Sequence, residues 1–206
     1  SSRRTSRKFK YMNYRNIINK GKSILKQHLI YNADIDSELL LSISLNKSRQ
    51  KTLLNSEEKL NQEQIDNYFK LINRRKKREP ISFITGNKFF WKDDFIINKN
   101  VLTPRAETEL LLEQVLKIYK ESNNIRVLDI GLGSGCILIS LLKEKSKWKG
   151  DGIDISKFAL KTAKTNAKIQ QVENRMRFIH SDIDNFNFGK YDLIVSNPPY
   201  INKIEY

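Results

Sequence analysis

Short apolar segments alternate with amphipathic ones throughout the second half of the chain, and no other feature of the sequence restricts the fold as strongly. The short segments have the length and the β-branched content of buried strands. The longer segments around them carry apolar residues at helical spacing. Alternation of this kind favours a parallel, doubly wound sheet of the α/β class. We therefore predict strands at residues 126–130, 150–155, 176–180 and 191–196, and helices at residues 107–120, 136–145 and 157–169.

The first half of the chain has a different pattern. Apolar stripes that begin at Ile17, Ile35 and Ile65 predict helices, and Pro80 ends the last of them. The aromatic and β-branched residues that follow are interrupted by Gly86-Asn87 and predict a β-hairpin. We expect four parts, namely a basic leader or tag over residues 1–11, a helical substrate-docking domain over 12–80, a β-hairpin linker over 81–103 and the α/β domain over 104–206.

Positive charge dominates the sequence, with a net charge of +15. Residues 1–32 contain nine Lys or Arg and no acid, and a second basic cluster occupies residues 74–78. Such clusters favour proximity to nucleic acid or to the ribosome, although a solvated lysine-rich surface has the same composition. Residues 1–11 resemble a tag or an organellar transit peptide.

Composition also excludes several classes of protein. A hydrophobic content of 39% is that of an ordinary globular chain rather than a disordered one. No apolar run reaches the length of a membrane span. The single cysteine, Cys136, excludes a disulfide within the chain. We expect a cytoplasmic monomer, or a protein of an organellar matrix if residues 1–11 belong to a transit peptide.

Glycines follow the first expected strand at every second position. Gly131, Gly133 and Gly135 let the backbone turn sharply and approach a nucleotide-like ligand, although a tight turn without a ligand has the same composition. The spacing differs from the dinucleotide fingerprint, and the lack of a following Gly-Lys-Ser/Thr excludes a P-loop. The candidate cofactor residues here are Asp129, Gly131, Leu132, Gly133, Ser134 and Gly135.

Acids lie at the end of the second expected strand and just after the third. Asp154 can accept hydrogen bonds from the ribose hydroxyls of a bound nucleoside, and Asp182 is a candidate contact to its base. Either acid also suits the cap of a helix. The neighbouring Ile155 and Ile183 complete the candidate cofactor set.

The sequence Asn197-Pro198-Pro199-Tyr200 directly follows the last expected strand and is the most specific motif of the chain. Two prolines stiffen the loop and offer carbonyl acceptors without N–H groups. With the Asn197 carbonyl they can hold both hydrogens of a planar –NH₂ group, while Tyr200 packs against it. Because the lone pair of such a nitrogen is delocalised, holding its hydrogens raises its reactivity towards a methyl donor. These four residues are the candidate catalytic residues, and Asn197 is also a candidate cofactor contact.

Together the motifs resemble class I methyltransferases that act on amino nitrogens. Three upstream stretches narrow the resemblance, namely residues 78–86 (REPISFITG), 90–91 (FW) and 101–109 (VLTPRAETE). With them the chain resembles the HemK/PrmC family of peptide chain release factor glutamine methyltransferases from Met12 onward. The resemblance implies an enzyme of protein methylation in translation termination. Its cofactor would be S-adenosylmethionine, and its substrate the glutamine side-chain amide in the Gly-Gly-Gln motif of class 1 release factors.

The resemblance also assigns residues. Gly131, Asp154 and Asp182 would contact S-adenosylmethionine, and residues 197–200 would contact the glutamine. Arg105 and Glu107 match family positions near the cofactor and the domain junction, and they are candidate substrate-binding residues, with an ion pair or a helix cap as the alternative. Methyl transfer would be a direct in-line displacement without a metal, and Cys136 would be dispensable.

The expected sheet has four parallel strands, whereas the family fold has seven. We therefore expect a C-terminally incomplete protein, with residues 1–206 poorly active or unstable alone. Three other functions fit part of the pattern. These are a nucleic-acid exocyclic-amine methyltransferase, a methyltransferase for a ribosomal-protein glutamine, and a truncated binding module without catalysis.

Overall fold

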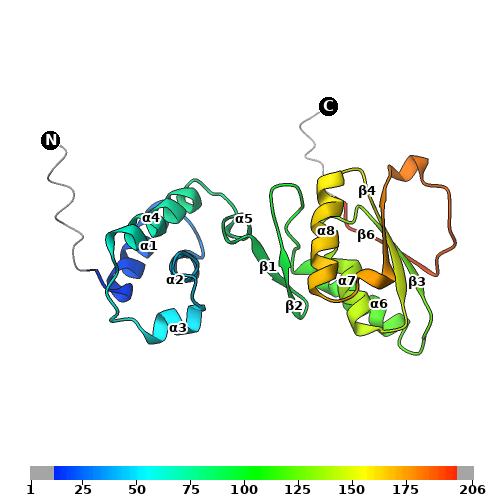
Figure 1. Ribbon diagram of the computed structural model, residues 1–206, viewed down its shortest axis with the longest axis horizontal. Coiled ribbons are helices and arrows are strands. Elements are labelled where there is room, and N and C mark those ends of the chain that lie inside the picture. The colour runs from blue at the N-terminus through cyan, green and yellow to red at the C-terminus, as the bar shows by residue number, and fades with distance from the viewer. Residues whose placement is uncertain (1–11, 199–206) are drawn as a thin grey trace. The chain divides into compact units, whose positions relative to one another are not determined.

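The computed structural model describes residues 12–198 and divides the chain into two compact units, with the boundary between Thr85 and Gly86. The first unit is helical (Figure 1). Its helices are α1 (Tyr14–Gln27), α2 (Ala33–Ser44), α3 (Arg49–Leu54), α4 (Gln62–Lys76) and α5 (Ile81–Thr85). Asn61 and Gln64 form a capping box at the start of α4.

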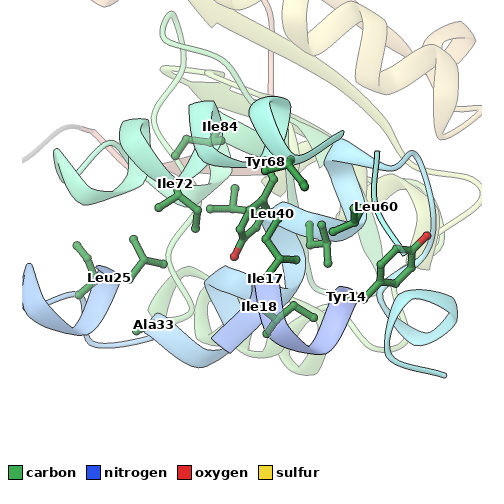
Figure 2. Close-up of a cluster of buried hydrophobic side chains, with 13 residues drawn as sticks. Tyr14, Ile17, Ile18, Leu25, Ala33, Leu40, Leu60, Tyr68, Ile72 and Ile84 are labelled. Atoms are coloured by element: carbon green, nitrogen blue, oxygen red, sulfur yellow. The ribbon is translucent and has the colours of Figure 1, made fainter. Parts of the chain in front are cut away.

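Apolar side chains of α1, α2 and α4 converge on one core (Figure 2). Ile17, Leu40 and Ile72 are fully buried within it. The Tyr68 and Ser37 hydroxyls are hydrogen-bonded at 2.7 Å inside this core, and Ser37 Oγ donates to the Ile18 carbonyl at 2.6 Å. Because these buried hydroxyls are paired, they link three helices without the cost of unsatisfied polar groups.

The segment directly after Pro80 is helical, so the prediction of extended backbone from residue 81 is wrong for α5. The Pro80 carbonyl accepts hydrogen bonds from the N–H groups of Phe83 and Ile84, at 3.0 and 3.2 Å, and these bonds start the turn. Proline suits this place because the first N–H groups of a helix have no partner within it. Ser82 and Ile84 are buried, and α5 packs against α2 and α4. Packing thus overrides the β propensity of the segment.

Ion pairs occupy two arginines of the basic cluster at the end of α4. Arg74 donates to the Glu79 carboxylate with Nε at 2.8 Å from Oε2. Arg75 Nε donates to Asp36 Oδ2 at 2.7 Å, and this aspartate is buried. These two guanidinium groups are therefore ion-paired within the first unit.

The second unit contains the α/β fold that the sequence predicts, preceded by the antiparallel hairpin of β1 (Asn87–Phe90) and β2 (Asp93–Ile96). The remaining elements in chain order are α6 (Glu107–Ile118), β3 (Arg126–Ile130), α7 (Cys136–Glu144), β4 (Lys149–Asp154), α8 (Lys157–Ile169), η1 (Glu173–Arg175), β5 (Met176–His180), η2 (Ile183–Asn185) and β6 (Leu193–Ser196). Strands β3 to β6 form one parallel sheet in the order β5-β4-β3-β6. Helix α7 packs on β3 and β4, and α8 packs on β4 and β5.

A buried asparagine on α8 joins the hairpin to the sheet domain. Asn166 is 1% exposed, and its Oδ1 accepts from the Ile96 N–H at 2.8 Å. Its Nδ2 donates to the Ile96 carbonyl at 3.1 Å and to the Ser134 carbonyl at 2.9 Å. One side chain thus holds β2 and the glycine loop to the same helix.

Membrane insertion by a helix finds no support in residues 12–198, where every helix is too short or too polar to cross a bilayer.

Candidate cofactor and substrate site

The registers of the parallel strands bring the predicted site residues to one edge of the sheet. Ile130 pairs with Ile153 on one side and with Ser196 on the other. The residues that follow these three positions are Gly131, Asp154 and Asn197, so they lie next to each other at the carboxyl edge of β4, β3 and β6. Ligands of open α/β sheets bind outside this edge.

The glycine loop has the backbone conformation that the sequence predicts. Gly131, Gly133 and Gly135 all have positive φ. Gly135 is the N-cap of α7 with φ 79°, and a Cβ at this position would lie 2.9 Å from Ile139 Cδ1 and 3.2 Å from Ala163 Cβ. A side chain is therefore excluded both by the backbone conformation and by the close approach of α7 and α8.

Asp129 is a buried acid with an unsatisfied oxygen. It is 1% exposed, and its Oδ2 lacks a hydrogen-bond partner among the described residues. Burial raises the pKa of this carboxyl to about 7, even though the Leu138 N–H in the first turn of α7 donates to it. An orphaned buried acid beside a glycine loop fits a ligand that carries positive charge, as S-adenosylmethionine does at its sulfonium and ammonium groups.

Asp154 and Asp182 differ in the backbone groups that their carboxylates bind. Asp154 Oδ2 accepts from the Gly133 N–H at 2.9 Å, and its Oδ1 accepts from the Ser156 N–H at 2.8 Å. The cap of α8 is Ser156, so Asp154 shapes the glycine loop instead of capping the helix. Asp182 is the N-cap of η2, and its Oδ1 accepts from the Asp184 N–H at 3.1 Å. The capping alternative therefore describes Asp182 and does not describe Asp154.

Asn197 is anchored by a threonine that the sequence analysis did not select. Its Nδ2 donates to Oγ1 of Thr108, in the first turn of α6, at 3.0 Å. Thr108 is 7% exposed and Asn197 is half-buried, so the bond is partly shielded from water. Both residues line a hollow of about 310 Å³ that Arg105, Glu107, Leu111 and Ser196 complete. Since the amide nitrogen is held by Thr108, the Oδ1 atom is the acceptor left for a ligand.

Cys136 is unsuited to covalent catalysis. It is buried at the start of α7, and burial raises the pKa of its thiol to about 12. Candidate metal sites are lacking as well among the residues that the structure describes.

Comparison with known proteins places this geometry in a family. The PrmC N-terminal domain matches residues 16–86, and the methyltransferase small domain matches residues 106–205. The release factor glutamine methyltransferase of Caulobacter vibrioides is 40% identical over 88% of this chain and 63% of its own length. That of Leptospira interrogans is 40% identical over 90% of this chain and 66% of its own length. The chain belongs to the HemK/PrmC family.

The HemK/PrmC relatives are longer than this chain. The chain spans just under two thirds of the two relatives named above and 38% of the bifunctional methyltransferase of Rickettsia bellii, which is 38% identical over 90% of the chain.

Three of the predicted cofactor residues differ in their exposure, and one of them is turned into the protein interior. Leu132 is buried, and its side chain fills the space beside Gly152, where a Cβ would lie 2.5 Å from Leu132 Cδ1. Leu132 therefore packs on β4 and leaves little side-chain surface for a ligand. Ile155 and Ile183 are 70% and 47% exposed and are open to solvent at the same edge.

The remaining predicted residues are only partly described in this HemK/PrmC chain. Pro198 is exposed directly after Asn197. Pro199 and Tyr200 lie outside the described residues. Arg105 and Glu107 come together with Asn197 around the same hollow. Thr108 and Asn166 were missed because their partners, Asn197 and Ile96, lie 89 and 70 residues away in the chain.

Proposed function

We propose that the protein transfers a methyl group from S-adenosylmethionine to the side-chain amide nitrogen of the glutamine in the Gly-Gly-Gln motif of class 1 peptide chain release factors. The observation that carries the proposal is the anchored Asn197 amide beside the glycine loop. Membership of the HemK/PrmC family supports this choice of substrate.

The cofactor residues are those at the carboxyl edge of β3 and β4. Asp154 holds the ribose hydroxyls, and the backbone of residues 131–135 lies against the nucleoside. Asp129 lies beneath the loop and balances positive charge there. When bound, S-adenosylmethionine supplies an activated methyl group on a sulfonium.

Asn197 prepares the accepting nitrogen. Its Oδ1 accepts a hydrogen bond from the glutamine –NH₂, while Thr108 Oγ1 accepts from the Asn197 amide nitrogen and so favours this orientation of the amide. Pro198 has no N–H and so adds no competing donor. Accepting the amide hydrogens raises the electron density on nitrogen and aims its lone pair, and such positioning contributes several kcal/mol to catalysis. The displaced proton leaves to solvent.

The helical unit and the hairpin hold the protein substrate in this proposal, over the ranges 12–80 and 81–103 expected from the sequence, with the methyltransferase domain over 104–206. The enzyme acts as a monomer in the cytoplasm, or in an organellar matrix if residues 1–11 are a transit peptide.

The decisive experiment supplies the full-length gene product with methyl-labelled S-adenosylmethionine and, in parallel, class 1 release factor, total RNA and total DNA. We expect label on the release factor, and loss of the label when the Gly-Gly-Gln glutamine is replaced. Label on nucleic acid alone would retain methyl transfer and reject the substrate. Label on a ribosomal protein alone would do the same. Cofactor binding without any transfer would favour the binding module.

Asn197→Ala separates catalysis from binding in the same assay. We expect turnover to fall far more than the affinity for S-adenosylhomocysteine. Equal losses would assign Asn197 a structural role.

A further inference from the structure

The edge of the sheet opposite the cofactor site surrounds a basic hollow. A space of about 510 Å³ lies where β3, β4 and β5 begin. Five cationic side chains line it, and only two acids do. The cations are Arg126, Lys147, Lys149, Arg175 and Arg177.

The arginines of this hollow are held in fixed orientations. Asp151, on β4, is 3% exposed and accepts from Arg126 Nη2 at 2.8 Å and from Arg177 Nε at 2.7 Å. The Tyr191 hydroxyl donates to the same carboxylate at 2.6 Å, and the Arg126 guanidinium lies 5.0 Å from the centre of the Tyr191 ring. Burial opposes ionisation of Asp151, but the hydrogen bonds from Arg177, Tyr191 and Arg126 outweigh it and lower its pKa to about 2. The network therefore persists at any physiological pH.

The charge of the hollow exceeds what its acids neutralise. Asp151 and Asp192 are the two lining acids, and Asp192 Oδ2 already accepts from the backbone N–H of Arg126 at 2.8 Å. Lys147 and Lys149 are exposed and lack an ion-pair partner among residues 12–198. The hollow thus has a surplus of three positive charges, and its cations are spread along the beginnings of β3, β4 and β5. Neighbouring strands lie about 4.8 Å apart. That spread suits several linked anions better than one small one.

We propose that this hollow binds the phosphate backbone of RNA. Asp151 takes the Nε and Nη2 donors of Arg177 and one Nη2 donor of Arg126. The remaining N–H groups of these guanidinium groups can donate to phosphate oxygens, and the lysines add mobile positive charge. None of the residues that line the hollow is aromatic, so it offers no platform on which bases could stack. The contact is therefore to the backbone and independent of sequence. RNA binding here leaves the cofactor edge of the sheet free, and it does not depend on the proposed methyl transfer.

The test is fluorescence anisotropy of a labelled oligouridylate with the full-length protein over a range of salt concentrations. The site variant is Lys147→Glu with Lys149→Glu, because neither side chain has a hydrogen-bond or ion-pair partner within residues 12–198. The matched control is Lys157→Glu with Lys161→Glu on α8, two exposed lysines outside the hollow, which changes the net charge equally. We expect the site variant to weaken binding about tenfold and to reduce the salt slope by about 2, with at most a twofold effect in the control.

Equal losses in both variants would show that net charge alone attracts RNA and would overturn the proposal. So would a wild-type protein that does not bind the oligonucleotide. Titration with inorganic phosphate distinguishes a site for small anions. If the protein binds phosphate but not RNA, and Lys147→Glu abolishes the binding of phosphate, the RNA proposal is rejected.

Discussion

Replacing Asn166 by alanine is expected to destabilise the second unit by about 3 kcal/mol. The change removes three hydrogen bonds, two to the Ile96 backbone and one to the Ser134 carbonyl. Each contributes about 1 kcal/mol net, and stranding a buried partner costs more than that where water cannot replace the amide. Alanine favours the helix by less than about 1 kcal/mol, which offsets little of the loss.

Urea denaturation monitored by tryptophan fluorescence reports on the unfolding of the second unit of the chain. The sequence contains 2 tryptophans, Trp91 and Trp148, and both belong to the second unit. With a slope of about 2 kcal/mol per M, the midpoint should fall by about 1.5 M. Thr165→Ala is the control. The hydroxyl of this exposed threonine donates to the Lys161 carbonyl within α8, so its removal should change stability by less than about 0.5 kcal/mol. A loss below about 1 kcal/mol in Asn166→Ala would refute the reasoning, since it would mean that water satisfies the freed groups.

Further substitutions test the site. Thr108→Val should lower kcat about tenfold at unchanged cofactor affinity, because it frees the Asn197 amide to rotate, while Thr108→Ser should restore kcat. Thr162→Val is its control, a buried threonine that instead accepts from Asn98, and an equal loss of kcat there would argue against positioning. Asp154→Asn should weaken S-adenosylhomocysteine binding about tenfold or more in calorimetry, and an unchanged Kd would contradict the ribose contact. Asp129, whose pKa rises from 3.8 to about 7 on folding, holds a proton that the unfolded chain releases, so this residue makes stability fall as pH rises from about 4 to about 7. Asp129→Asn should remove this decrease in stability with pH. If the urea midpoints of the wild type and the variant depend on pH in the same way, Asp129 is not its source.

Much of this architecture was predictable because its signals are local. Strand and helix periods lie within single segments. Gly131 and Asn197 directly follow strands and Asp154 is the last residue of one, so parallel pairing alone brings them together. The contacts of Thr108 and Asn166 depend on partners far along the chain, and nothing beside either residue indicates them. Helix α5 was missed for a related reason, since burial against α2 and α4 decides its conformation rather than its own propensity.

The pairing of β3 with β6 also determines where the gene can change length. Asn197 lies next to Gly131 only because Ser196 is in register with Ile130, and the Ser196 hydroxyl donates to the Ile130 carbonyl at 2.9 Å. One residue inserted within β6 would turn its side chains to the opposite face and move the amide out of place. The same insertion in the exposed loop around Gly189, upstream of β6, would change neither the pairing nor the motif. Insertions and deletions among homologous genes should therefore accumulate in that loop and be rare within β6.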